Sequence, residues 1–250
     1  MATTACITLD KALEQTRTGD IWLFRGHTLA DRAIRVGTNS PVNHVGMSVV
    51  IEDLPPLMWH AELGRSLEDL WSGNRHRGVQ LHDLRAAVLV WTRRYGQRAW
   101  LRQLEHPPLP GMEDALLRTI ARLDGTPFPS TARLASRWLL GRLPTPHRPG
   151  HSPAGGPADG PAESPVDGPA EGPAGGLEGP GRALETAYCA EVVAATYQSM
   201  GLLSAERQPQ WYDPGRFWSG DELELLAGAR LGGEIAVQVP DSMTGARNRP

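Results

Sequence analysis

The fold is decided by two β-type runs that follow one another, VNHVGMSVVI at residues 42–51 and LMWHAEL at residues 57–63, joined by the turn sequence EDLPP at residues 52–56. Both runs are rich in apolar residues, and the two prolines between them mark a turn. The pair is therefore predicted to form an antiparallel hairpin. Further strands of the same sheet are predicted at residues 19–26, 78–84, 87–94 and 234–239.

Apolar residues recur at helical spacing in several other segments, at residues 29–36, 112–123, 130–140 and from about Thr186 to Gly201. The last of these is predicted to be an amphipathic helix with Cys189 in its first turn. The expected fold class is α+β, with an antiparallel sheet packed against the helix that bears Cys189.

The chain has 250 residues, 40% of them hydrophobic, which fits one packed domain. Residues 144–181 differ in composition, because Gly-Pro-Ala units separated by Asp, Glu and Ser offer almost no large apolar side chain to offset the entropy of ordering. Glycine does not recur at every third position, which excludes a collagen helix. We expect residues 1–143 and 182–240 to form one catalytic domain, residues 144–181 a disordered insertion, and residues 241–250 a tail.

Composition also limits the partners. The net charge is −3, Lys11 is the only lysine, and no basic block is interleaved with aromatic residues, so nucleic acid is not an expected partner. No apolar run reaches the ~18 to 20 residues of a membrane span, and no export signal is visible, so the expectation is a soluble cytoplasmic protein. The two cysteines, Cys6 and Cys189, are expected to be free thiols.

Cys189 is the best candidate for a nucleophile. Unpaired backbone N–H groups and the positive end of the helix dipole favour the thiolate at a helix start. A nucleophilic thiol needs a base, and the base needs an orienting partner. His44 fits the base, because it shares a strand face with Gly46, whose missing side chain leaves room for a helix end or a substrate. His60, on the adjacent run, fits the orienter, and Glu62 on the same strand face competes with it for that role.

These residues lie in segments that resemble a known group. The segments are GDI at residues 19–21 with Phe24-Arg25-Gly26, NHVGM at 43–47, MWHA at 58–61, GVQL at 78–81, and YCAEVV at 188–193 running on to MGLL at 200–203. Together they resemble the circularly permuted branch of the papain-like NlpC superfamily, in particular YiiX-like hydrolases, and more distantly lecithin:retinol acyltransferase. The order is reversed relative to papain, because the histidine strand precedes the cysteine helix.

The resemblance implies a permuted papain-like fold in which Cys189 is the nucleophile, His44 the base, and a polar residue on the next strand the orienter. Such proteins often have Glu where His60 stands here. The implied activity is hydrolysis of an amide, ester or thioester through an acyl-enzyme, on substrates such as cell-wall-type peptide amides or fatty-acyl groups; water or an amine would release the acyl group, so acyl transfer is an alternative.

Other interpretations stand beside this one. A buried cysteine in an Ala/Val-rich helix is often inert packing, and the chain is then a papain-like binding module that has lost efficient turnover. Glu191 caps the helix in one interpretation and is catalytic in another. The Gly-Pro-Ala segment is a candidate tether for a protein partner. No cofactor and no metal are expected, because the remaining histidines have no Cys or carboxylate partner at zinc-finger spacing; they are His27, His76, His82, His106, His147 and His151.

Overall fold

The computed structural model describes residues 5–27, 40–62, 64–107, 109–127, 180–220 and 223–239. In this part of the chain, one seven-stranded sheet has the strand order β1-β9-β6-β2-β3-β4-β5. All neighbouring strands in it are antiparallel except the parallel pair β1 and β9. The strands are β1 (Cys6–Thr8), β2 (Ile21–Arg25), β3 (His44–Val49), β4 (Leu57–Glu62), β5 (Gly78–Asp83), β6 (Arg98–Arg102) and β9 (Ile235–Gln238).

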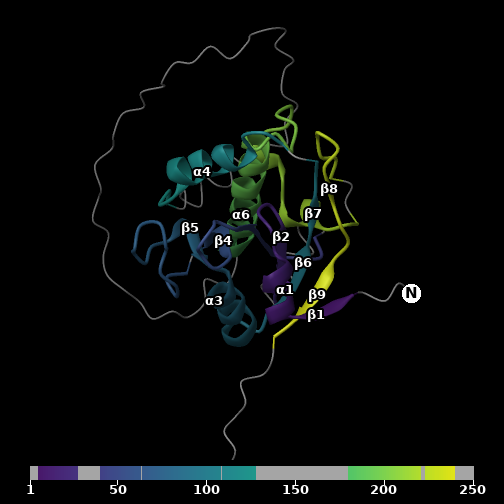
Figure 1. Cartoon of the computed structure of the whole chain (residues 1–250). Coiled ribbons are helices and arrows are strands. Elements are labelled where there is room, and N and C mark those ends of the chain that lie inside the picture. Colours follow the sequence, from purple (N-terminus) through teal and green to yellow (C-terminus); the bar gives the residue numbers. More distant parts are fainter. Residues whose placement is uncertain are drawn as a thin grey trace, which may run out of the picture.

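Helices lie on both sides of this sheet (Figure 1). They are α1 (Leu9–Gln15), α3 (Leu84–Leu89), α4 (Met112–Leu123) and α6 (Pro180–Ser199), with a π-helical turn at Val90–Arg94 and 3-10 turns at Pro209–Trp211 and Pro214–Phe217. A second, two-stranded sheet pairs β7 (Leu104–Glu105) with β8 (Arg230–Leu231). The architecture is therefore mixed α+β with a mostly antiparallel sheet, as the sequence predicts.

The predicted antiparallel hairpin is confirmed. Strands β3 and β4 pair antiparallel, with Met47 opposite Trp59 and Ser48 opposite Met58. The strands predicted at residues 19–26, 78–84 and 234–239 and the helix at 112–123 are present as β2, β5, β9 and α4. Since side chains alternate along each strand, this register assigns every residue of the hairpin to one face of the sheet.

The two faces of the sheet have separate apolar cores. On one face, Val45, Met47 and Trp59 pack with residues of α6 and α4. On the other face, Trp22, Phe24 and Met58 pack with residues of α1, α3 and the π-helical turn. In Figure 1, α4 and α6 accordingly lie toward the top of the molecule, and α1 and α3 toward the bottom. We refer to these as the α6 face and the α3 face.

The prediction of a strand at residues 87–94 is wrong. This segment is helix α3, which continues into the π-helical turn. The apolar run imitates a buried strand, but Asp83 begins a helix there, because its carboxylate accepts a hydrogen bond from the backbone N–H of Ala86 at 2.7 Å.

The predicted helix start is wrong as well. Helix α6 begins at Pro180, so Cys189 lies at its middle and not in its first turn. Good helix formers such as Arg182, Ala183 and Leu184 extend the helix backwards, and proline is tolerated in a first turn. Glu191 consequently caps no helix start. From Tyr188 to Tyr197 most side chains are buried, so this part of the helix is surrounded by core and is not amphipathic.

Several expectations lie outside the described residues. They are the helices at residues 29–36 and 130–140, the insertion up to residue 179, and the tail from residue 241. Pro180 and Gly181, which the sequence assigns to the insertion, are part of α6.

Candidate functional site

Polar side chains gather on the α3 face of strands β3, β4 and β5, in what we call the histidine cluster: His44, His60, Glu62, Gln80 and His82. The cluster arises from spacing, because His60 and Glu62 are two residues apart on β4, and Gln80 and His82 are two apart on β5. The register places His60 opposite Gln80, so both pairs share one face. All five side chains are buried.

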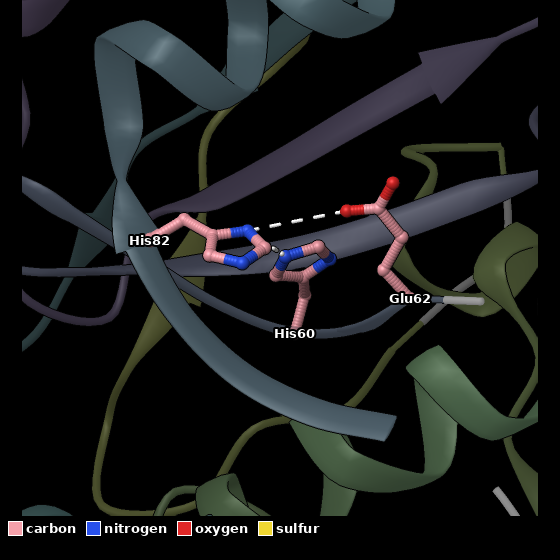
Figure 2. Close-up of side chains that lie close together, drawn as sticks. All are labelled: His60, Glu62 and His82. Carbon is pink, nitrogen blue, oxygen red and sulfur yellow. Dashed lines mark hydrogen bonds and ion pairs between the residues drawn. The ribbon is translucent and has the colours of Figure 1, made fainter. Parts of the chain in front are cut away.

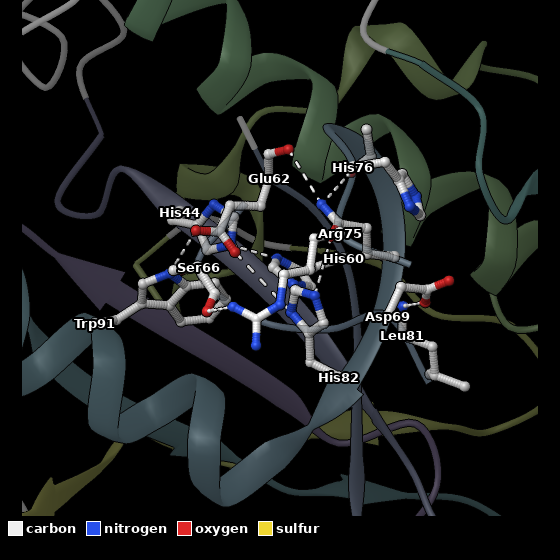
Figure 3. Close-up of polar contacts among 12 residues, drawn as sticks. His44, His60, Glu62, Ser66, Asp69, Arg75, His76, Leu81, His82 and Trp91 are labelled. Atoms are coloured by element: carbon white, nitrogen blue, oxygen red, sulfur yellow. Dashed lines mark hydrogen bonds and ion pairs between the residues drawn. The ribbon is translucent and has the colours of Figure 1, made fainter. Parts of the chain in front are cut away.

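Three imidazoles of the cluster form a hydrogen-bonded row (Figure 3). Nε2 of His44 lies 3.2 Å from Nδ1 of His60. Nε2 of His60 in turn lies 3.0 Å from Nδ1 of His82. The row ends at Gln80, whose Oε1 lies 3.1 Å from Nε2 of His82. The sequence expectation that His44 and His60 meet across the hairpin is therefore confirmed, while the catalytic roles assigned to them stay predictions.

Gln80 fixes the direction of this row. Its side-chain Nε2 donates to two backbone carbonyls, those of Glu62 and Gly78, both at 3.4 Å. Its Oε1 therefore faces His82 as an acceptor, so Nε2 of His82 carries a hydrogen and Nδ1 of the neutral ring has the lone pair. His60 then donates from Nε2 to His82, and His44 donates from Nε2 to His60. In this arrangement the basic nitrogen of His44 is Nδ1.

Burial keeps the three imidazoles neutral. It lowers the pKa of His44 to about 3 and that of His82 to about 4, against an opposing effect of the Asp69 carboxylate. The pKa of His60 lies well below its usual value because of burial first and the neighbouring His82 and His44 second. Nδ1 of His82 lies 3.9 Å from Oε2 of Glu62. With His82 neutral, this contact is not an ion pair at neutral pH.

Aromatic side chains enclose the cluster on the α3 face. The ring of Trp91 meets those of His44 and His60 edge to face, at centroid distances of 4.6 and 4.7 Å. Its indole N–H also donates to Oε1 of Glu62 at 3.4 Å. Phe24, the register partner of His44 on β2, lies against the His44 ring. The cluster is thus a group of polar side chains surrounded by apolar ones.

His60, Glu62 and His82 are arranged as metal ligands are (Figure 2). One nitrogen of each imidazole and one carboxylate oxygen lie within 4.8 Å of one another. His82 has no Cys or carboxylate partner at zinc-finger spacing along the chain, so that spacing does not predict it as a ligand. The pattern that does identify it runs across the strands: each of two neighbouring strands has two polar residues at alternate positions.

The structure does not bring Cys189 to this cluster. Helix α6 packs against β3 and β4 on the α6 face, where Cys189 is part of the apolar core. The ring contacts of His44 are with Phe24, His60 and Trp91, all on the α3 face. The expectation that His44 faces the Cys189 helix is therefore wrong. The side chain of Cys189 is buried, with 0% of its surface exposed, whereas the side chain of Cys6 is exposed.

The role expected of Gly46 also needs correction. A Cβ atom at this position would collide with Sδ of Met58 and approach Cβ of His60 to 3.4 Å. The space that glycine leaves is therefore filled by its neighbours on β4, and not by a helix end or a substrate. Gly46 lets Met58 and His60 pack closely over β3.

The fold and this site define a mixed α+β protein with a buried histidine cluster on one face of its sheet. No protein-family model matches the chain, and no curated protein matches it. Among solved structures, the chain is similar to one described as metalloprotein yiiX from Escherichia coli O157:H7 (DUF1105), with 22% identity and a TM-score of 0.34. The match covers 47% of this chain and 55% of that one, so the chain spans about half the length of that structure.

None of the helices in the described part of the chain has the length and apolar character of a membrane span.

Proposed function

We propose that this protein is a binding module of permuted papain-like architecture, and that the histidine cluster is its working site. The observation that supports this proposal is the location of Cys189 and His44 on opposite sides of the sheet. A nucleophilic thiol needs a base within hydrogen-bond reach and a route for the substrate. A buried cysteine in a closely packed core commonly acts as a small apolar side chain.

The histidine cluster is a stronger candidate for function than for stability. Polar groups lose hydration when they are buried, and an apolar layer of the same volume would hold β3, β4 and β5 together without that loss. Here three imidazoles, an amide and a carboxylate are buried side by side. Their hydrogen bonds offset the lost hydration and fix the rings in one orientation, which is what a binding site requires.

Alkylation by iodoacetamide at mildly acidic pH tests the proposal, and Cys6 provides a control within the chain. We expect Cys6, which is exposed, to be labelled faster than Cys189 in the folded protein. We also expect His44→Ala to leave the Cys189 rate unchanged as long as the variant stays folded. Fast labelling of Cys189 that disappears in His44→Ala would contradict the proposal.

One observation favours a second candidate, the thiol hydrolase. Nε2 of His44 and Nδ1 of His60 lie 3.2 Å apart, as a base and its orienter would. In that mechanism Cys189 transfers its proton to Nδ1 of His44 and attacks an amide, ester or thioester carbonyl. The protonated imidazole then gives its proton to the leaving group. Water or an amine finally attacks the acyl-enzyme and releases the acyl group from Cys189. The labelling experiment distinguishes the two candidates, because only the hydrolase needs a reactive Cys189.

A further inference from the structure

We propose that His60, Glu62 and His82 bind one divalent transition-metal ion, through Nε2 of His60, Nδ1 of His82 and a carboxylate oxygen of Glu62. The inference rests on the proposed function in that it names the ligand of the histidine cluster. It is independent of whether Cys189 reacts with electrophiles.

The distances between the ligand atoms suit a metal. Bonds of about 2.0–2.1 Å in a tetrahedral site separate the ligand atoms by about 3.3 Å. Nε2 of His60 and Nδ1 of His82 are 3.0 Å apart. Nδ1 of His82 and Oε2 of Glu62 are 3.9 Å apart. One contact is shorter and the other longer than this ideal, and all three ligand atoms lie within 4.8 Å of one another, so small side-chain rotations would bring them to a common ion.

The ligand types point to the class of metal. Two neutral imidazoles and one carboxylate are typical of zinc and of other first-row divalent ions such as cobalt and nickel, whereas calcium and magnesium prefer oxygen ligands alone. The carboxylate also lowers the cost of bringing a dication into a buried site. Zinc is therefore the probe of choice, and cobalt is its coloured substitute.

Each ligating histidine has a partner that holds its other nitrogen. Nε2 of His82 donates to Gln80, and Nδ1 of His60 faces Nε2 of His44. Outer partners of this kind orient metal-bound histidines and raise their basicity. His82 already has its lone pair on the ligating nitrogen, since Gln80 is fixed by two backbone carbonyls.

Metal binding would reverse one hydrogen bond of the row. Without metal, His60 carries its hydrogen on Nε2 and donates to His82. A metal on Nε2 requires the His60 hydrogen on Nδ1, where it points to Nε2 of His44. Nε2 of His44 must then accept, so the His44 hydrogen moves to Nδ1. His60 and His44 both change tautomer, His82 does not, and the cluster releases no proton.

The first test is zinc and cobalt titration of the full chain, with refolding in the presence of the ion because the ligands are buried. We expect one zinc ion per chain and cobalt absorption bands of a nitrogen and oxygen site. Affinity should fall about 10–100-fold in Gln80→Leu, as for other outer-partner changes, and further in Glu62→Gln and His82→Gln. His76→Gln is the matched control, because His76 lies in the loop that leads into β5 and is outside the ligand set. The zinc affinity of this variant should stay within about twofold of wild type.

The second test is nitrogen-15 NMR of the histidine rings in the wild-type chain, which needs no variant. Zinc should switch the protonated nitrogen of His60 and His44 from Nε2 to Nδ1 and leave His82 protonated on Nε2. The absence of stoichiometric binding after refolding with zinc would overturn the proposal, as would binding that Glu62→Gln and His82→Gln both leave intact. Neither result would alter the relative labelling of Cys189 and Cys6, so a failed metal site and a failed proposed function are distinguishable.

Discussion

The indole N–H of Trp59 donates a hydrogen bond to Oγ1 of Thr196 at 3.0 Å, and so ties the strand that carries His60 to the helix that carries Cys189. Trp59 and His60 are consecutive, and consecutive side chains of a strand point to opposite faces. The contact that anchors α6 therefore requires His60 to point away from it. The same alternation on β3 directs His44 away from α6 as well.

Thr196→Val should destabilise the protein by about 1–3 kcal/mol, because it leaves the buried indole N–H of Trp59 without an acceptor. Thr119→Val is the matched control. Thr119 is also a buried helical threonine whose hydroxyl donates to the carbonyl four residues earlier, at 2.8 Å in both helices. Urea unfolding of both variants measures the difference. Equal losses in the two variants would show that the indole bond contributes nothing.

Gly46→Ala should destabilise the protein by about 1–3 kcal/mol, since the added methyl group overpacks the contact with Met58 and His60. Gly233→Ala is the control, because a Cβ atom there meets no neighbour within 4 Å. Chemical denaturation gives the two free energies of unfolding. If Gly46→Ala were as stable as Gly233→Ala, the space over β3 would be larger than the structure indicates.

The sequence predicts the centre of the sheet because alternation and turn residues are local signals. Strands β2 to β5 carry such signals, and the side-chain contact between His44 and His60 is made across the hairpin of β3 and β4. The sequence does not reveal β6, where Arg98 and Arg102 interrupt the apolar pattern. Nor does it tell which face of the sheet a helix distant in sequence covers, and that choice separates Cys189 from His44.

His82 and Gln80 could not be predicted as part of the histidine cluster for a different reason. His82 and Gln80 reach His60 only through the register of β5 on β4, which places His60 opposite Gln80. The loop between these strands is long, so no hairpin rule fixes that register in advance. A search for polar residues at alternate positions on successive strands would have found the pair.

Cys189→Ala should cost about 1–2 kcal/mol of stability, because the sulfur fills space in a closely packed core. Cys6→Ala should change stability by less than about 0.5 kcal/mol, since Cys6 is exposed. The comparison uses the same substitution at both sites, so differences in side-chain chemistry cancel. A neutral Cys189→Ala would mean that the thiol makes little contact with the core, and would revive the case for a reactive role.

Asp20 should make stability depend on pH in an unusual direction. Its carboxylate accepts hydrogen bonds from the backbone N–H groups of Arg17 and Leu104, at 2.8 and 2.7 Å. Burial outweighs these bonds and raises the pKa of Asp20 from 3.8 to about 6. A raised carboxyl pKa contributes stability that is complete below pH 3.8 and is lost as pH rises through about 6.

Asp20→Asn isolates this contribution, because asparagine does not ionise and the buried histidines titrate alike in both proteins. Asparagine keeps one acceptor oxygen, so the variant loses one of the two backbone bonds, and the cost of that loss does not change with pH. The informative quantity is the difference in unfolding free energy between wild type and variant. A shift of about two pKa units corresponds to about 3 kcal/mol, so wild type should lose roughly that much of its advantage between pH 4 and pH 7. A difference that stays constant across this range would mean that Asp20 titrates near its ordinary pKa, and that its two backbone bonds fully offset the effect of burial.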